Sequence, residues 1–209
     1  MTNRNQGCFL AFEGIDGSGK STQIELLRQR LERENIPCVF TREPTDFPVG
    51  ALLRRILTGG IQADPRVVAA LFTADRLDHL LQPEKGVLDI IRRGSSVVTD
   101  RYYFSSYAYQ SVDVPMDRII DANAQSAELL RPAANIFIDV DPDEALQRIA
   151  ANRDHVELFE TRERLTATRE KYFEAFGRLR DTERVLIFDG SREAQALSDE
   201  IWEAVKGFF

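Results

Sequence analysis

The sequence predicts an α/β fold in which a five-stranded parallel sheet is flanked by helices on both faces, in the doubly wound arrangement. Short apolar runs suited to buried strands alternate with longer segments of helical periodicity along the whole chain. That alternation favours parallel strands joined by right-handed helical crossovers. No repeat, low-complexity tract or linker divides the 209 residues, so we expect a single domain spanning 1–209.

The overall composition argues against several classes of protein, including nucleic-acid-binding, membrane-spanning and disulfide-rich proteins. The formal net charge of −7 argues against a general nucleic-acid surface. No apolar run reaches the length of a membrane helix, and the polar start carries no signal-peptide pattern. Cys8 and Cys38 give neither a disulfide framework nor metal spacing, and we interpret both as small core residues in strands. We therefore expect a cytoplasmic protein that binds neither membrane nor nucleic acid.

A glycine-rich turn joins the first strand to the first helix. The apolar run over 8–12 is typical of a buried strand, and apolar residues recur at helical spacing over 20–34. Between them lie glycines, a lysine and a hydroxyl residue in the pattern of a phosphate-binding loop. Such a turn aims backbone N–H groups and the helix dipole at one point, which therefore binds phosphate. The expected ATP-binding residues are Gly14, Ile15, Asp16, Gly17, Ser18, Gly19, Lys20, Ser21 and Thr22.

Two side chains of this loop have specific expected roles. Lys20 would reach the β- and γ-phosphates, and the Ser21 hydroxyl would hold Mg²⁺. The simpler alternative is a strand-to-helix turn without a ligand, which the combination of pattern and flanking elements disfavours.

The second strand is expected over 36–40, and a polar cluster follows it at 41–45. Side chains just beyond the carboxyl end of a strand are where open α/β sheets bind ligands. A short helix over 50–57 ends at two glycines, and the next helix, over 64–81, begins with an N-cap and proline at Asp64-Pro65. The elements that follow are a helix over 84–92, a strand over 95–99, a helix over 103–110 and a helix reaching about 130.

The last third of the chain continues the alternation. A fourth strand over 135–140 leads to Asp141-Pro142, which starts a helix running to about 151. A charged stretch over 152–160 then precedes a long helix that ends near 179. The fifth strand is expected over 185–188, and the last helix is expected to open at Ser191.

A phosphate loop alone does not fix the reaction, because many nucleotide-binding proteins share it. The guanine-reading pattern of a GTPase switch is absent from the sequence. Arginines instead follow strand ends and the fourth strand, at Arg42, Arg101, Arg148 and Arg153. That distribution suits phosphoryl transfer onto a second phosphate, because at ~4 Å and an effective dielectric of ~20 each pair of like charges opposes approach by about 4 kcal/mol. For any single arginine the alternative is a surface ion pair.

Two further points fit phosphoryl transfer to a phosphate. A phosphomonoester acceptor is mostly a dianion at neutral pH, so it needs no general base, and no convincing base stands out in the sequence. Asp100 lies at the end of the third strand, where an acidic side chain could hold Mg²⁺ directly or through water.

Six blocks in fixed order carry a resemblance that covers nearly the whole chain. Each block is weakly specific alone, but together they resemble the thymidylate kinase family of P-loop nucleoside monophosphate kinases, which phosphorylate dTMP with ATP. The blocks are 12–23, 41–44, 72–76, 100–102, 105–110 and 139–142 with 148–149.

The resemblance implies roles for eight residues in dTMP binding. Phe72 would stack on the thymine ring, although its spacing alone is typical of helix core. Arg76 and Gln110 would read opposite parts of the base edge. Tyr109 would pack below the sugar, and Asp16 would accept a hydrogen bond from its 3′-hydroxyl. Arg42 and Arg101 would hold the acceptor phosphate. The implied dTMP-binding residues are Asp16, Arg42, Phe72, Arg76, Arg101, Ser105, Tyr109 and Gln110.

Members of the resembled family differ in where they carry one transition-state arginine. Some carry it inside the phosphate loop, at the position of Gly17 here, so we expect it in a short lid over 152–160. Arg153 is the first candidate and Arg148 the second. The sequence also departs from the family pattern at Ser111, where glycine is common, and in the loop over 112–116. The expected catalytic residues are Lys20, Arg153, Arg148, Arg101 and Asp16.

Two other functions remain open from the sequence. A kinase for another pyrimidine monophosphate, such as dUMP, is the nearest, because a methyl pocket is worth only ~1–3 kcal/mol of selectivity. A non-catalytic ATP-binding regulatory protein is the second. The resemblance also implies a homodimer, to which the helix over 64–81 could contribute.

Overall fold

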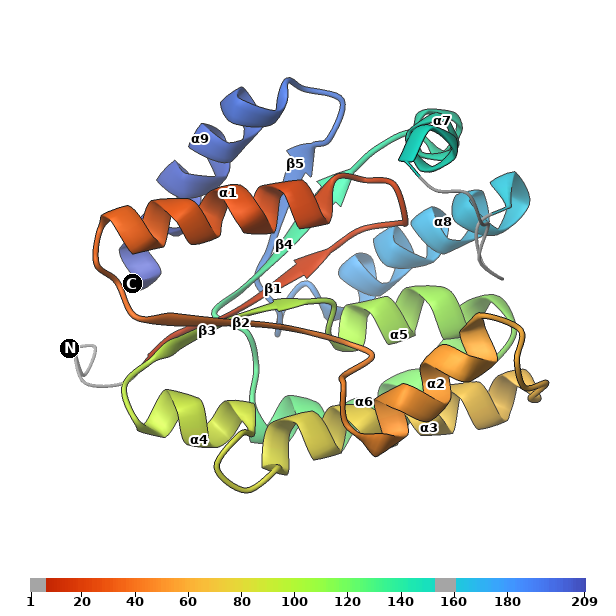
Figure 1. The fold of residues 1–209 in the computed structure, drawn as a ribbon. Coiled ribbons are helices and arrows are strands. Elements are labelled where there is room, and N and C mark those ends of the chain that lie inside the picture. Colours follow the sequence, from red (N-terminus) through yellow and green to blue (C-terminus); the bar gives the residue numbers. More distant parts are fainter. Residues whose placement is uncertain (1–6, 153–160) are drawn as a thin grey trace.

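The computed structural model describes residues 7–152 and 161–209, and a five-stranded parallel sheet forms its centre (Figure 1). The strand order is β2-β3-β1-β4-β5, and every neighbouring pair is parallel. The predicted fold class is therefore confirmed. The strands are β1 (Phe9–Glu13), β2 (Cys38–Arg42), β3 (Ser96–Asp100), β4 (Ala134–Asp139) and β5 (Val185–Asp189).

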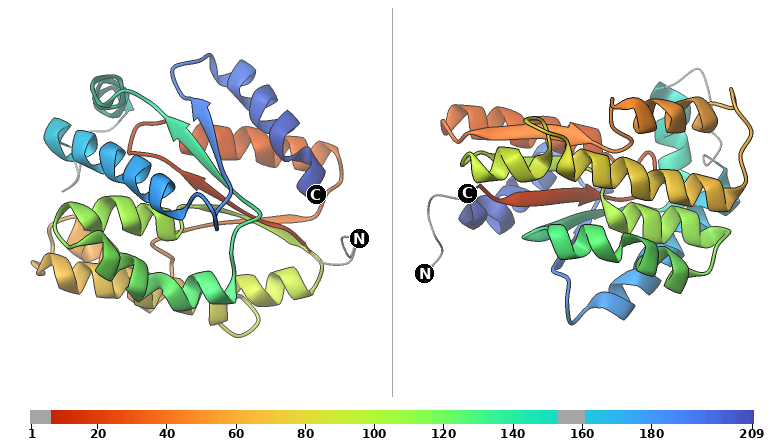
Figure 2. Two further views of the ribbon diagram at one scale, coloured as in Figure 1. Left: turned by 180° about the vertical axis from the view of Figure 1, so that it is seen from behind. Right: turned by 90° about the horizontal axis from the view of Figure 1, so that it is seen from below.

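Helices cover both faces of the sheet. Helices α1 and α9 lie on one face, and α4, α5, α6 and α8 lie on the other (Figures 1 and 2). The helices are α1 (Lys20–Arg33), α2 (Pro48–Leu57), α3 (Pro65–Leu81), α4 (Val87–Arg92), α5 (Tyr103–Tyr109), α6 (Met116–Leu129), α7 (Pro142–Asn152), α8 (Arg162–Leu179) and α9 (Ala194–Val205), with short 3₁₀ turns η1 (Gln110–Val112) and η2 (Lys206–Phe208).

The central strand β1 supplies side chains to two separate cores. Leu10 and Phe12 pack under α1 and α9, whereas Phe9 and Ala11 pack against the opposite layer. This alternation follows from the two-residue period of a strand, and burial of both faces explains why the strand is apolar from Phe9 to Phe12. The outer strands β2 and β5 are less enclosed.

Several element boundaries differ from the sequence expectation, and three of them are informative. The strand expected over 36–40 runs over Cys38–Arg42, so it includes part of the polar cluster. The helix expected over 84–92 begins only at Val87, after Gly86. The last helix begins at Ala194 and not at Ser191, because the Asp189 carboxylate accepts from the Ser191 N–H while Glu193 caps the helix.

The two cysteines are less enclosed than expected. Both side chains are partly buried against the core under α1, and Cys8 lies just before β1 rather than within it. They form no disulfide in the described part of the chain. Burial raises the pKa of the Cys38 thiol to about 12, so the thiol stays protonated and behaves as a small apolar group.

The topology places one crevice at the carboxyl edge of the sheet. From β1 the chain crosses through α1 to the outer strand β2, whereas β4 lies on the other side of β1. Ligands of doubly wound sheets bind where the connections diverge in this way. The glycine turn after β1 lies at that point. None of the helices in the described residues combines the length and hydropathy that a membrane crossing requires.

Candidate active site

The phosphate loop leads from β1 into the first turn of α1. Its backbone takes left-handed conformations at Gly17, where φ is 78°, and at Gly19, where φ is 97°. A Cβ atom at Gly17 would lie 2.4 Å from the Ala145 carbonyl oxygen, so no side chain fits there without a shift of backbone. The glycines of the sequence pattern are therefore required by the geometry of this turn.

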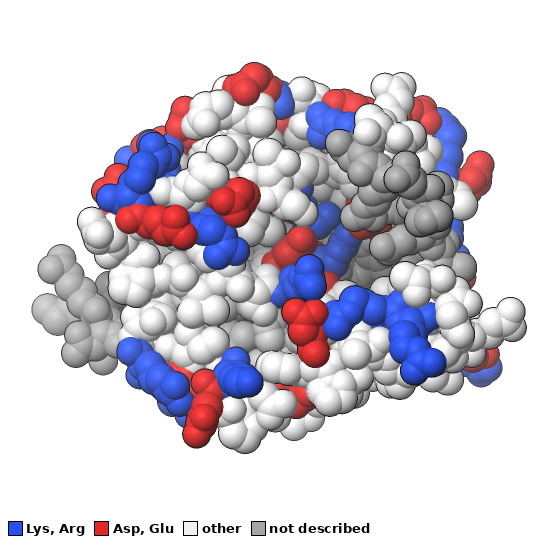
Figure 3. Space-filling view, in the orientation of Figure 1, with Lys and Arg blue, Asp and Glu red and all other residues white. Residues whose placement is uncertain are grey.

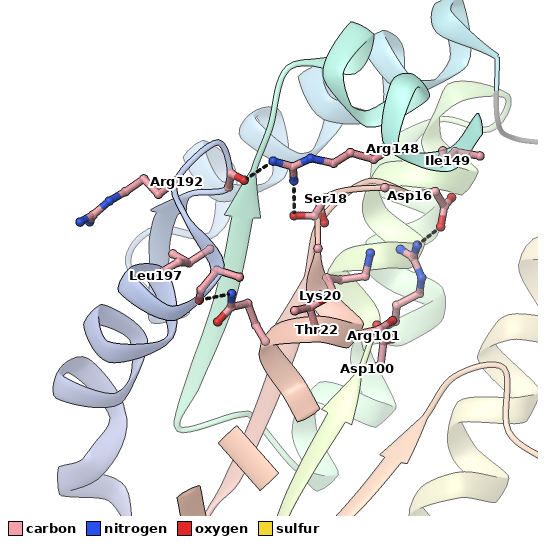
Figure 4. Close-up of a pocket in the computed structure, with 16 residues that line it drawn as sticks. Asp16, Ser18, Lys20, Thr22, Asp100, Arg101, Arg148, Ile149, Arg192 and Leu197 are labelled. Atoms are coloured by element: carbon pink, nitrogen blue, oxygen red, sulfur yellow. Dashed lines mark hydrogen bonds and ion pairs between the residues drawn. The ribbon is translucent and has the colours of Figure 1, made fainter. Parts of the chain in front are cut away.

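A cavity of about 600 Å³ lies over the phosphate loop and extends along the amino end of α1. The loop, the end of β3, helix α7 and the segment after β5 form its walls (Figure 4). We call it the donor cavity. Its lining residues are Asp16, Gly17, Ser18, Gly19, Lys20, Ser21, Thr22, Gln23, Asp100, Arg101, Arg148, Ile149, Gly190, Arg192, Ala194 and Leu197.

Lys20 is the central cation of the donor cavity. Its Nζ donates to the carbonyl oxygens of Gly14 and Ile15, each at 3.0 Å, and the side chain is almost fully buried. Burial, with a smaller contribution from the nearby Arg101 charge, lowers the pKa of Lys20 from its ordinary 10.5 to about 8. A phosphate in the cavity would supply the counter-charge that the buried ammonium needs.

Arg101 and Asp16 form the wall of a second, smaller cavity as well as of the donor cavity. The Arg101 Nη2 atom lies 2.6 Å from the Asp16 carboxylate and also donates to the Tyr109 hydroxyl at 3.1 Å. The Tyr109 hydroxyl in turn donates to Asp16 at 2.8 Å. Two adjoining cavities therefore share one ion pair, which Figure 4 shows beside Lys20.

The backbone at Arg101 is strained. Its φ of 73° lies in the left-handed region that a non-glycine residue seldom adopts. The Arg101 N–H donates to the Phe12 carbonyl at 2.9 Å, which holds the residue against β1. Strain of this kind clusters at functional sites, where the surrounding structure overrides the local preference.

The second cavity, of about 100 Å³, opens between α3 and α5; we call it the acceptor cavity. Phe72 and Gln110 lie in its wall with Asp16 and Arg101. The buried Gln110 Oε1 has no hydrogen-bond partner among the described residues, which is the state expected of an atom that a ligand satisfies. The lining residues are Asp16, Pro44, Leu57, Phe72, Arg101, Ser105, Ser106, Tyr109 and Gln110.

Two expected acceptor ligands lie outside this cavity. Arg76 is 1% exposed and donates to Glu43, Ser106, Asn123 and the Tyr102 carbonyl. It therefore lies behind Ser106, which forms the cavity wall. Arg42 is exposed, pairs with Asp46 at 3.1 Å and lines a third cavity of about 410 Å³.

The third cavity adjoins the donor cavity at Ser21 and Asp100. The Asp100 Oδ1 atom is buried, and the described residues offer it no hydrogen-bond partner. An orphaned carboxylate oxygen beside an exposed hydroxyl fits a hard cation, which prefers oxygen ligands. No cluster of three or more acidic, histidine or cysteine ligands occurs in the described ranges, so any Mg²⁺ here would rely mainly on phosphate and water.

The structure places one of the two expected transition-state arginines. Arg148, on α7, donates to the Gly190 carbonyl at 2.8 Å (Figure 4). It also pairs with Glu144 at 2.5 Å. Its Nη1 lies 3.5 Å from the Ser18 carbonyl, so it reaches the edge of the phosphate loop. Arg153 and the expected lid over 152–160 fall outside the described residues, apart from the helical backbone of Asn152.

Sequence reasoning missed several residues of the site. Gly190 and Arg192, just beyond β5, and Leu197 on α9 line the far end of the donor cavity. The position of Gly190 and Arg192 after a strand is the same signal that singled out Arg42 and Asp100, so these two could have been found. Glu13 and Tyr172 meet under the phosphate loop, where the Tyr172 hydroxyl donates to the Glu13 carboxylate at 2.9 Å. No spacing in the sequence indicates that contact.

Comparison with known proteins agrees with this geometry. The profile of the thymidylate kinase family matches residues 12–201. A probable thymidylate kinase of Pyrobaculum calidifontis is 42% identical over 165 residues, which cover 78% of this chain and 80% of the relative. A thymidylate kinase of Symbiobacterium thermophilum is 34% identical over 203 residues, covering 95% and 92%. A third, from Leptospira borgpetersenii, is 34% identical over 195 residues, covering 93% and 91%. The chain belongs to the thymidylate kinase family.

Proposed function

We propose that the protein transfers the γ-phosphoryl group of ATP to dTMP, giving dTDP and ADP, across the boundary between the donor and acceptor cavities. The observation that carries the proposal is the Asp16–Arg101 pair, which lines both cavities. Membership of the thymidylate kinase family supports dTMP phosphorylation as a step toward dTTP.

Charge is the main obstacle to this reaction, because two anionic groups must meet. At ~4 Å and an effective dielectric of ~20, each pair of unit charges opposes the approach by about 4 kcal/mol. Lys20 supplies positive charge from the donor side, and Arg101 supplies it at the shared wall. The dianionic acceptor phosphate attacks without a general base, since its second pKa is about 6.

Mg²⁺ fits the donor side of this arrangement. The Ser21 hydroxyl and the orphaned Asp100 carboxylate would hold it, Asp100 directly or through water. When bound, the ion would neutralise phosphate charge and fix the orientation of the triphosphate. Lys20 remains the residue that holds the phosphates from the loop side.

The acceptor cavity suits a single-ring base with a deoxyribose. Phe72 offers an aromatic face, and stacking of a base on such a face is worth roughly 1–3 kcal/mol. Gln110 Oε1 can accept from a ring N–H, and Asp16 can accept from the 3′-hydroxyl. Tyr109 lies beside Asp16, where it would crowd a ribose 2′-hydroxyl.

Arg42 and Arg76 take modified roles in this proposal. Arg42, exposed beside the shared Ser21 and Asp100, would turn from Asp46 toward the acceptor phosphate when the nucleotide binds. Arg76 would act indirectly, because it donates a hydrogen bond to Ser106 in the wall of the acceptor cavity that would receive the base. For the transition state we retain Arg153 as first candidate and Arg148 as second. Gly17 supports that choice, because the backbone there cannot carry an arginine without shifting.

The test is an acceptor panel with the purified protein, ATP and Mg²⁺. We expect dTMP to be the best acceptor, with dUMP weaker by about 10- to 200-fold at most because only a methyl group separates them. A better turnover of dUMP or of a purine monophosphate would refute the assignment. ATP binding without transfer to any monophosphate would instead favour the regulatory function.

A homodimer is part of the proposal. Val67 and Leu81, near opposite ends of α3, are 50% and 51% exposed. Their exposure supports α3 as part of an interface between two copies. Light scattering that gave the mass of one chain, 23.8 kDa, at assay concentration would contradict the dimer.

A further inference from the structure

One buried hydroxyl touches the phosphate loop, β1 and α5 at once. Tyr172, on α8, is 0% exposed and donates from its hydroxyl to Glu13 Oε2 at 2.9 Å. The same oxygen receives the Gly14 N–H at 3.4 Å and lies 2.9 Å from the Ser105 Oγ. Burial raises the pKa of Tyr172 well above its ordinary value, so the hydroxyl keeps its proton at physiological pH.

A second set of hydrogen bonds leads from Arg101, in the wall that the two cavities share, to the same Glu13 carboxylate. Arg101 Nη1 donates to the Ser105 Oγ at 3.1 Å and to the Gly14 carbonyl at 3.1 Å. The Ser105 hydroxyl donates a hydrogen bond to Glu13 Oε2 at 2.6 Å. Glu13 is fully buried and also accepts the Tyr102 N–H at 2.9 Å. The carboxylate is thus the common acceptor for both halves.

The chain of donors runs from the phosphate loop through Tyr172 to Glu13, and from Arg101 through Ser105 to the same carboxylate. Each member has its hydrogen bonds satisfied in the dry interior, where such networks rigidify their surroundings. We propose that Tyr172 is a positioning residue that, through Glu13 and Ser105, fixes the position of Arg101 relative to the phosphate loop. It touches neither cavity itself.

The inference rests on the proposed function, because the relative position of Arg101 and the phosphate loop matters only if a phosphoryl group passes between the two cavities. Small errors in the placement of reacting groups lower the rate of the chemical step far more than they lower binding. Loss of the Tyr172 hydroxyl should therefore reduce kcat and leave the affinity of each nucleotide nearly unchanged.

The chain offers a matched control. Tyr103 is also 0% exposed, and its hydroxyl donates to the Glu183 carboxylate at 2.7 Å. Tyr103→Phe removes the same kind of buried bond, but neither residue of that pair lines the donor or the acceptor cavity. A merely structural role for Tyr172 predicts equal effects of Tyr172→Phe and Tyr103→Phe on turnover.

The experiment compares kcat and both KM values for the full chain and the two variants, with ATP, dTMP and Mg²⁺. Binding of an adenosine–thymidine pentaphosphate, which spans both cavities, is measured alongside dTMP alone. We expect Tyr172→Phe to lower kcat and weaken the spanning ligand by about tenfold, with dTMP affinity within about twofold. Tyr103→Phe should leave all of these within about twofold. Equal kcat values for the two variants, or a loss confined to KM, would overturn the inference.

A second variant covers the case in which Tyr172→Phe does not fold. Glu13→Gln keeps the shape of the common acceptor but removes its charge, and it should lower kcat in the same way. Where both variants fold, their effects on kcat should be non-additive in the double variant, because they act on one network. Additive effects, or an unchanged kcat for Glu13→Gln, would overturn the inference. Failure of the wild type to phosphorylate dTMP would instead refute the proposed function.

Discussion

Lys20→Met tests the electrostatics of the donor cavity through stability as well as activity. In the folded protein the pKa of Lys20 is lowered from 10.5 to about 8, chiefly by burial. Since each pKa unit is worth about 1.4 kcal/mol, the charged ammonium costs the folded state about 3 kcal/mol at neutral pH. Methionine has a similar length and carries no charge, so the variant should lose phosphoryl transfer. At pH 7 it escapes the cost of burying the charge, but the Gly14 and Ile15 carbonyl oxygens lose their donor, so the pH dependence of stability is the diagnostic quantity.

The sign of the pH dependence follows from linkage. Between pH 8 and 10.5 the unfolded chain keeps the proton that folded Lys20 has released, so this group makes the wild type more stable as pH rises. By pH 9.5 the gain relative to pH 7 is about 2 kcal/mol, and Lys20→Met should lack it. The difference between the wild-type and Lys20→Met free energies of unfolding at each pH cancels the contributions of the other titrating groups, including the buried tyrosines.

The assay is urea unfolding of the wild type, Lys20→Met and the control Lys85→Met at half-unit steps from pH 7 to 9.5. Lys85 is exposed, so its loss should not change the slope. A wild-type minus Lys20→Met difference that stays flat over this range would show that Lys20 titrates normally and would refute the reasoning. Bound ATP should flatten the wild-type curve, because its phosphates favour the charged lysine.

Three further predictions concern the acceptor side and the transition state. Phe72→Ala should raise the KM for dTMP by roughly 5- to 150-fold, as loss of ~1–3 kcal/mol of stacking requires, with kcat nearly unchanged; steady-state kinetics would contradict this if kcat alone fell. Arg76→Met should cost about 3–5 kcal/mol of unfolding free energy in urea, because it leaves the buried Glu43 carboxylate without its guanidinium partner and with the His79 ring alone; a cost below ~1 kcal/mol would show that the pair is dispensable. Arg153→Ala should lower kcat more than it changes the KM for dTMP, and an equal or larger kcat loss in Arg148→Ala would assign the transition-state role to Arg148.

The sequence predicted the sheet and the phosphate loop because both depend on local pattern. Apolar runs of strand length, glycines that permit left-handed turns and N-caps such as Asp64 each act within a few residues. The shift at Ala194 arises where two local signals compete, because the Asp189 carboxylate holds Ser191 in a turn that precedes the cap at Glu193.

The placement of side chains across the site depended on contacts that no local pattern contains. Phe72 and Arg76 lie four residues apart on α3, but only Phe72 lines the acceptor cavity, whereas Arg76 is buried and pairs with Glu43, 33 residues away. The contact between Glu13 and Tyr172 spans 159 residues. Such partners become visible only when the order β2-β3-β1-β4-β5 brings the strand ends together. The sequence therefore located the residues that belong to short motifs, but it did not reveal the distant residues that hydrogen-bond to them.

In the proposed reaction the Asp16 carboxylate competes with the acceptor phosphate for Arg101. Asp16 lies 2.6 Å from Arg101 Nη2, so a phosphate that binds this guanidinium would displace the carboxylate and would need further contacts to do so. Orthophosphate would bring none, whereas a nucleotide would also contact Phe72 and offer Asp16 a hydroxyl in exchange. The exchange of counter-ions at Arg101 would therefore favour a nucleotide over a small free anion.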